Sequence, residues 1–194
     1  MPVRRAARFM LAYAFIIAMG SASASAATLI HLTFDEMTAQ SSAILLGHCV
    51  SVSSAWNAAH SDIVTQNVFE VSEYYKGNLG QHVTLTELGG QVDNWVSDYT
   101  GVPRFKVGEE AVLFLWTDPQ GQHQVIGLTQ GKFQVVRNTA TGQILLNQTP
   151  SFHTPIEPPT HSHSEAAGPL VLPMTVFKDQ VQLLLKKPAG GARQ

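Results

Sequence analysis

Histidine side chains are the first candidates for chemistry in this chain of 194 residues. His161 and His163 lie one residue apart, and His153 lies a short distance before them. Neutral imidazoles bind zinc or copper, and two histidines at this spacing can both be ligands in an extended segment. A site also needs a third or fourth ligand from a rigid element, and the pattern does not indicate one. The sequence therefore predicts no metal site and leaves open whether these three histidines bind an ion.

Carboxylate pairs are a second source of chemistry, because glycoside hydrolases use two of them as acid and base. The candidates are Asp93, Asp98, Glu109 and Glu110. Nothing in their spacing enforces the separation of carboxyl groups that this reaction requires, and adjacent residues of a strand point to opposite faces. We therefore interpret them as solvated side chains. Since glycine-rich phosphate loops and zinc-binding helix motifs are also absent from the sequence, we expect neither an enzyme nor a cofactor.

The single cysteine, Cys49, is a candidate nucleophile. His48 precedes it, but neighbouring side chains on a strand point in opposite directions, so the imidazole is badly placed to activate the thiol. One cysteine cannot form an internal disulfide. We predict that Cys49 is a buried, unreactive thiol.

Aromatic side chains offer binding rather than catalysis. Trp95 and Tyr99 fall in a segment without a clear period, residues 91–104, and Trp56 falls in a polar connection. Aromatic rings on such segments stack on sugars or anchor protein partners, and an arginine adds directed hydrogen bonds. We predict that Trp56, Trp95, Tyr99 and Arg104 contact a ligand. The alternative is that the rings cover the open ends of a core.

Short strands must position these residues. Residues 63–75 alternate well, with Ile63 and Phe69 on the same face. A turn at Gly108 leads into a continuous apolar run, residues 110–116, which is too short for a membrane span and typical of a buried strand. The other predicted strands are 44–53, bulged near Gly47, then 83–88, 123–127, and a hairpin of 131–136 with 144–146. This pattern predicts an all-β fold, either a sandwich or a small barrel of five to seven strands.

Two helices are expected to accompany the strands. Thr33 and Glu36 form a capping box, so a helix of about two turns should begin there. Near the end of the chain, Phe177, Val181 and Leu184 recur at helical spacing in an amphipathic pattern. The sequence leaves open whether this C-terminal helix docks on the barrel or binds a partner.

The chain divides into four parts. Basic residues, an apolar stretch and a run of small residues make residues 1–26 a signal peptide, so we expect export to a periplasm or to the outside of the cell. Residues 27–147 form the barrel domain. Residues 148–172 are a linker rich in Pro, His and Ser, and residues 173–194 are the C-terminal helix and tail.

Charge narrows the choice of partners. Of the 12 Lys and Arg residues, Arg4, Arg5 and Arg8 lie in the leader, so the remaining chain carries nine basic and 14 acidic residues, a net charge of −5. Nucleic acids and anionic lipids favour clustered Lys and Arg. We expect no nucleic-acid partner and no stable membrane anchor after the leader is removed. The oligomeric state is left open.

The order of these signals resembles a known family. Leu46-Gly47-His48-Cys49-Val50 is followed by the strand 65–71, by Tyr75-Lys76-Gly77, and then by Phe105-x-x-Gly108-Glu109-x-x-Val112-Leu113-Phe114-Leu115. This order is similar to that of uncharacterised exported bacterial proteins and, more distantly, to the netrin-like module of tissue inhibitors of metalloproteinases. The resemblance covers residues 43–136. It implies an OB-fold barrel, a fold whose loops hold oligosaccharides, oligonucleotides or proteins.

The resemblance does not carry the inhibitors' chemistry to this chain. Those inhibitors chelate the protease zinc through a cysteine at the mature N-terminus, whereas here the mature chain would begin near Ala27 and Cys49 is alone. We therefore predict an exported, non-enzymatic binding module that recognises a protein or glycan of the cell envelope or its surroundings. The alternatives are a metalloprotease-inhibitor-like protein and a metal-dependent hydrolase that uses histidines.

Overall fold

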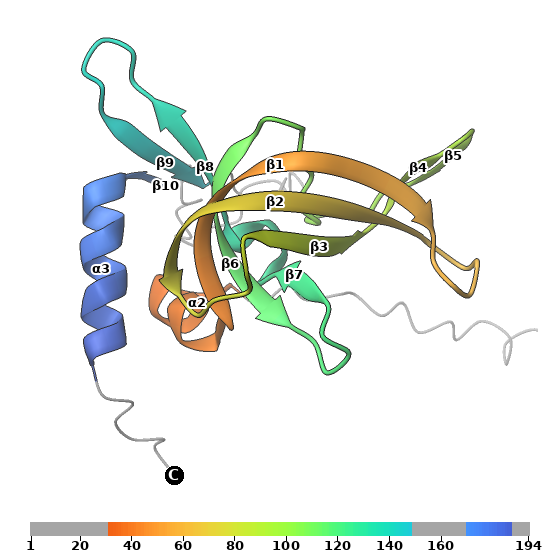
Figure 1. Cartoon of the computed structure of the whole chain (residues 1–194), viewed down its shortest axis with the longest axis horizontal. Helices are drawn as coiled ribbons and strands as arrows, with labels where there is room; N and C mark the ends of the chain where they lie inside the picture. Colours follow the sequence, from red (N-terminus) through yellow and green to blue (C-terminus); the bar gives the residue numbers. More distant parts are fainter. Residues whose placement is uncertain (1–30, 149–169, 188–194) are drawn as a thin grey trace, which may run out of the picture. The chain divides into compact units, whose positions relative to one another are not determined.

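Strands form the framework of the computed structural model, which describes residues 31–148 and 170–187 (Figure 1). In chain order the elements are α2 (Phe34–Gln40), β1 (Ala43–Trp56), β2 (Ile63–Lys76), β3 (His82–Leu88), β4 (Gly90–Val92), β5 (Trp95–Ser97), β6 (Glu110–Thr117), β7 (His123–Val125), the 3-10 helix η1 (Leu128–Gly131), β8 (Lys132–Arg137), β9 (Ile144–Gln148), β10 (Leu170–Pro173) and α3 (Met174–Lys186). No helix within these ranges has the length and apolar character needed to cross a membrane. The predicted signal peptide and most of the predicted linker lie outside the described residues.

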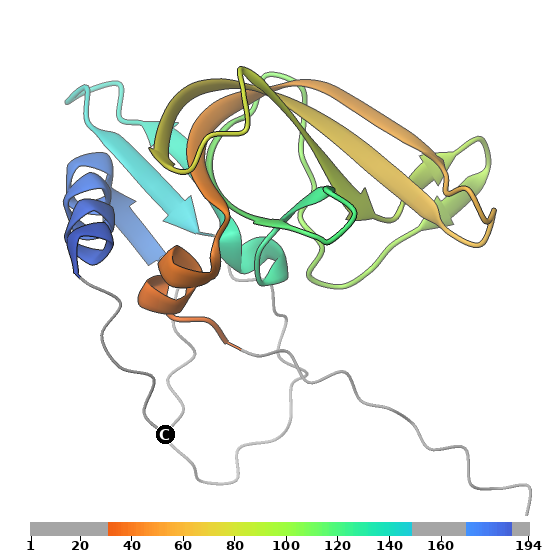
Figure 2. The same ribbon diagram turned by 60° about the horizontal axis from the view of Figure 1, so that its bottom comes forward.

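Five strands close into a barrel. β1 pairs with β2, β2 with β3, and β6 with both β7 and β1, all antiparallel, while β3 and β7 pair in parallel. The order β1-β2-β3-β7-β6 therefore returns to β1, and Figure 2 shows these strands curling around a common interior. This closed, mixed barrel with a short N-terminal helix and a C-terminal helix confirms the predicted fold class, an all-β, OB-like small barrel.

Alternation along β2 produces the barrel interior. Ile63, Thr65, Asn67 and Phe69 are buried, as the period of two predicts, because successive strand residues point to opposite faces. The neighbouring strand β1 is bulged where the sequence predicts it, with a register shift against β2 between Leu46 and Gly47. A Cβ atom at position 47 would lie 2.7 Å from a backbone oxygen of β2, so only glycine allows this close approach.

The apolar run of β6 is continuous because both faces of that strand are buried from Ala111 to Leu115. Leu113 and Leu115 face the barrel interior together with Phe69 of β2. Val112 and Phe114 face a second core on the other side of the strand. A strand covered on both faces needs no polar residues, which explains why its sequence does not alternate.

The second core lies beneath the two helices. Strands β8, β9 and β10 continue the sheet from β6, and α3 lies alongside β9 and β10 (Figure 1). Phe34 of α2 and Phe177 of α3 meet edge to face, with ring centroids 5.7 Å apart, and both contact Phe114 and Phe133. The predicted capping box of α2, formed by Thr33 and Glu36, is present. The C-terminal helix is therefore docked on the sheet.

The end of the predicted linker differs from expectation. Leu170–Pro173 forms β10, which pairs antiparallel with β9 so that Leu172 lies opposite Leu146. The strand is only four residues long, and its partner lies across residues 149–169, so no local pattern indicates it. The strand leads directly into Met174, the first residue of α3.

Candidate ligand-binding site

The connection between β1 and β2 fixes the position of Trp56, the last residue of β1. Hydrogen bonds of Asn57 join the two ends of this connection. The backbone N–H of Asn57 donates to the carbonyl of Asp62 at 2.8 Å, and its Oδ1 accepts the N–H of Ser61 at 3.0 Å. His60 has φ 52°, in the left-handed region that tight loops use. These bonds make the connection a defined turn rather than an open loop.

Residues 91–104 were expected to be irregular, and this expectation is wrong for the first part. β4 and β5 pair as a small hairpin in which Val92 lies opposite Trp95, leaving Asp93 and Asn94 as a two-residue turn. Asp93 has φ 52°, which aspartate tolerates better than most residues. The Asp-Asn pair between two short runs was the available signal, since two-residue hairpin turns favour Asn, Asp and Gly.

The two elements bring their tryptophans together. The rings of Trp56 and Trp95 meet edge to face, with centroids 6.2 Å apart and planes at 69°, and His60 stacks on Trp56 at 6.2 Å and 23°. We call Trp56, His60 and Trp95 the indole cluster. Trp95 is 66% exposed, whereas Trp56 is half-buried. The cluster therefore presents one supported, accessible indole to the solvent.

Tyr99 and Asp62 tie the segment after the hairpin to the β1–β2 turn. The Tyr99 hydroxyl donates to Asp62 Oδ1 at 2.5 Å. Since Asp62 belongs to the turn that carries His60, this bond links both sides of the indole cluster. Tyr99 remains partly exposed, but its hydroxyl group already has a partner within the protein.

Arg104 secures the base of the hairpin. Its guanidinium donates to the carbonyl of Leu88, the last residue of β3, at 2.8 Å and to Asp98 at 2.9 Å. A Cβ atom on Gly89 would lie 2.5 Å from this guanidinium, and Gly89 has φ 83°, so glycine is required by both space and conformation. Arg104 therefore has partners that orient the segment, in addition to its predicted contact with a ligand.

Buried polar groups lie beneath the hairpin, in the barrel wall. Thr65 donates its hydroxyl to the carbonyl of Gly89 at 2.6 Å, and Glu87, 5% exposed, accepts the N–H of Val125 at 2.9 Å. Burial raises the pKa of Glu87 to about 7, against the opposing effects of the Val125 hydrogen bond and of Arg104. No sequence motif marks Glu87 as a functional residue. Its position two residues after the buried Leu85 on β3 was the signal that its side chain points inward, because alternate strand residues share a face.

Three of the four candidate carboxylates are in ion pairs. Asp98 pairs with Arg104, as described, Glu109 lies 2.6 Å from the ammonium of Lys132, and Glu110 accepts from the guanidinium of Arg137. Glu109 and Glu110 both pair with residues of β8, whereas Asp98 pairs with the segment that follows the β4–β5 hairpin.

Histidine and cysteine side chains form neither a metal site nor a reactive thiol in the described part of the chain. Within residues 31–148 and 170–187, no three His, Cys, Asp or Glu side chains are grouped so that they could hold a metal ion. His153, His161 and His163 lie outside these residues. Cys49 is buried, and burial raises the pKa of its thiol, which disfavours the reactive thiolate.

The predicted site residues thus fall into one region of the molecule. Trp56 and Trp95 are in contact, Tyr99 is bonded to the turn that follows Trp56, and Arg104 holds the hairpin that carries Trp95. Comparisons of the chain with protein-family models, with curated proteins and with solved structures gave no match.

Proposed function

We propose that this protein is an exported, non-enzymatic binding module that recognises a protein or glycan of the cell envelope or its surroundings through the indole cluster. The observation that carries the proposal is the exposure of Trp95, 66%, on a hairpin whose position is fixed by Trp56. Leaving an indole in water forgoes the burial of a large apolar surface. A tryptophan that is both exposed and held in place is typical of a binding surface.

The surroundings of Trp95 supply the other groups that recognition needs. Its indole offers a flat apolar face for the C–H groups of a sugar ring or for an apolar side chain. Asp93 and Asn94, in the adjacent turn, are exposed and can form hydrogen bonds around that face. Because the rings are already ordered by their contacts within the protein, little side-chain entropy is lost on binding.

The proposed location depends on the leader. Residues 1–26 have the basic, apolar and small-residue regions that direct secretion. A single, buried cysteine is compatible with an oxidising compartment, because it neither requires nor forms an internal disulfide.

Affinity capture tests the proposal directly. The purified protein is immobilised and exposed to the solubilised cell envelope of its host, and retained material is quantified for the wild type, Trp95→Ala and Trp116→Ala. Trp116 is a matched control, because it is also an exposed tryptophan, 43%, but lies on β6 outside the indole cluster. We expect Trp95→Ala to weaken retention at least about tenfold, as for an aromatic hot spot, and Trp116→Ala to leave it unchanged.

Two further treatments identify the ligand class. Digestion of the envelope fraction with protease should abolish retention of a protein, whereas periodate oxidation should abolish retention of a glycan. If Trp95→Ala and Trp56→Ala both retain the same material as the wild type, the indole cluster is not the binding surface.

A further inference from the structure

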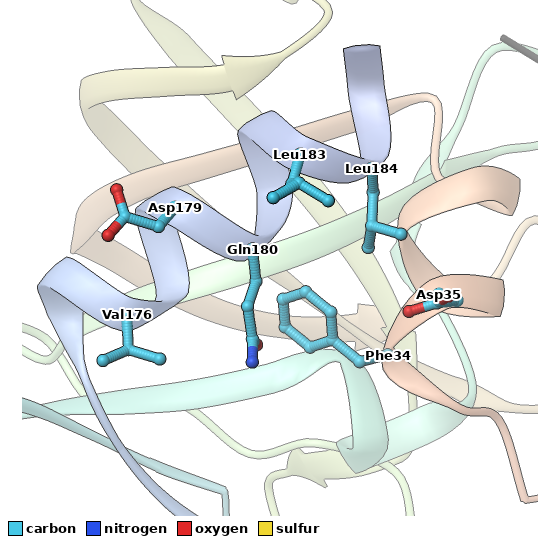
Figure 3. A pocket seen from close by; sticks show the side chains of 7 residues that line it. All are labelled: Phe34, Asp35, Val176, Asp179, Gln180, Leu183 and Leu184. Atoms are coloured by element: carbon cyan, nitrogen blue, oxygen red, sulfur yellow. The ribbon is translucent and has the colours of Figure 1, made fainter. Parts of the chain in front are cut away.

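A groove lies between α2 and α3 (Figure 3). Its volume is about 400 Å³, and its apolar lining comes from Phe34 of α2 and from Val176, Leu183 and Leu184 of α3. We call it the α2–α3 groove. None of its lining residues belongs to the indole cluster, so it is a second surface with its own chemistry.

Two apolar side chains of this groove, Val176 and Leu183, are not explained by the docking of α3, whereas Phe34 packs into the second core. The helix is held by Met174, Phe177 and Val181, which are buried. A helix needs one apolar stripe to dock. Val176 and Leu183, seven residues apart and therefore on one side of the helix, form a second stripe, and Leu183 is 70% exposed.

Negative charge flanks the groove from both helices. Asp35 of α2 and Asp179 of α3 line it, as Figure 3 shows, and neither carboxylate has an ion pair or hydrogen bond with another described residue. The neighbouring cation on α3, Lys178, is turned away, with its ammonium 2.8 Å from Glu73 and above the ring of Tyr75. No Lys or Arg side chain is among the lining residues.

We propose that the α2–α3 groove binds an amphipathic helix of a partner protein, with Leu-like side chains on one face and Lys or Arg beside them. Such a helix inserts anchors at positions i, i+3 or i+4 and i+7 into an apolar groove. Its basic residues complement Asp35 and Asp179, which are otherwise without a counter-charge in the described structure. Charge complementarity of this kind selects the partner and its orientation.

A pair of designed peptides tests this proposal. The first is a helix-forming peptide with Leu at positions i, i+4 and i+7 and Lys beside them, and the second is identical except that Glu replaces each Lys. Binding to the purified protein is measured by fluorescence anisotropy at low and physiological salt. We expect the Lys peptide to bind, the Glu peptide to bind at least about tenfold more weakly, and salt to weaken only the Lys peptide.

Protein variants locate the binding surface. Leu183→Ser should weaken the Lys peptide roughly tenfold, while Leu185→Ser, an exposed leucine of the same helix that does not line the groove, should have no effect. Asp35→Asn combined with Asp179→Asn should weaken it by about threefold or more and reduce its salt dependence. Thermal unfolding of every variant checks that α3 remains docked.

Several outcomes would overturn the proposal. These are equal binding of the two peptides, failure of the Lys peptide to bind, or unchanged binding by Leu183→Ser and by the double Asp variant. A dimer that becomes a monomer in Leu183→Ser would assign the groove to a second copy instead. Binding that appears only after residues 1–26 are removed would assign it to the chain's own N-terminal segment.

Discussion

The side chain of Glu87 joins the strands β3 and β7 of the barrel. The backbones of β3 and β7 form a single bridge within the described residues, Leu85 opposite His123. Two residues further along each strand, Glu87 accepts the N–H of Val125 at 2.9 Å, so its carboxyl group continues the connection. Water is largely excluded there, which raises the pKa of the carboxyl group to about 7. Glu87 therefore stabilises the seam best when it is protonated.

Stability should consequently fall as the pH rises from about 4.5 to about 7. Below the ordinary pKa of 4.5, Glu87 is protonated in both the folded and unfolded chain. Between these pH values the unfolded chain releases the proton more readily, which favours unfolding by roughly 1 kcal/mol per pH unit, and above about pH 7 the loss is complete. The measurement is the free energy of unfolding in urea across this pH range for the wild type and for Glu87→Gln.

The glutamine variant provides the control, because it keeps the acceptor for Val125 and cannot ionise. The difference in unfolding free energy between the wild type and Glu87→Gln should change in favour of the variant as the pH rises from 4.5 to 7. A difference that is independent of pH would show that Glu87 does not titrate in this range.

At the scale of elements, the docking of α3 rests on Phe177. This ring is fully buried and meets Phe34, Tyr75, Phe114 and Phe133 at centroid distances of 5.2 to 6.3 Å. Removing it leaves a cavity between α3 and the sheet that the surrounding rings can fill only in part.

Phe177→Ala should therefore lower the free energy of unfolding by about 3–5 kcal/mol. Leu183→Ala, on the same helix but 70% exposed, should change it by less than about 0.5 kcal/mol. Urea denaturation followed by circular dichroism measures both. Equal, small effects of the two substitutions would contradict the docking of α3 through Phe177.

Elements with a strong local pattern could be predicted from the sequence. The alternation of β2, the capping box at Thr33 and the helical spacing of Phe177 and Val181 each depend on residues close together in the chain. The hairpin β4–β5 and the strand β10 could not be predicted in the same way. Their strands have three or four residues, too few for a period, and β10 is stabilised by a partner far along the chain.

The contacts between elements of the candidate site could not be predicted from the sequence. The sequence indicates that Trp56 and Trp95 lie on connecting segments, but their contact depends on the β4–β5 hairpin returning toward the β1–β2 turn. The partners of Tyr99 and Arg104, which are Asp62 and Asp98, likewise follow from the folded geometry. Composition indicates which residue types are available, whereas tertiary structure decides which groups are already paired.

At the scale of the whole molecule, the barrel is closed by pairings between distant strands. β1 pairs with β6, and β3 pairs with β7, across long intervening segments. Hydrophobic periodicity predicts that strands exist but not which of them are neighbours, so the closure was expected only from the resemblance to an OB-fold. The sequence feature most consistent with this closure is the continuous apolar run of β6. That strand is buried on one face by the barrel interior and on the other by the helix-covered core.

The proposed role of this barrel, as a scaffold that presents the indole cluster, is tested most directly by following its three tryptophans during binding. The protein is labelled with 5-fluorotryptophan, its three resonances are assigned with single Trp→Phe variants, and ¹⁹F NMR spectra are recorded while envelope ligand is added. We expect the resonances of Trp95 and Trp56 to shift together and that of Trp116 to stay unchanged. A shift confined to Trp116, or binding that leaves all three resonances unchanged, would contradict it.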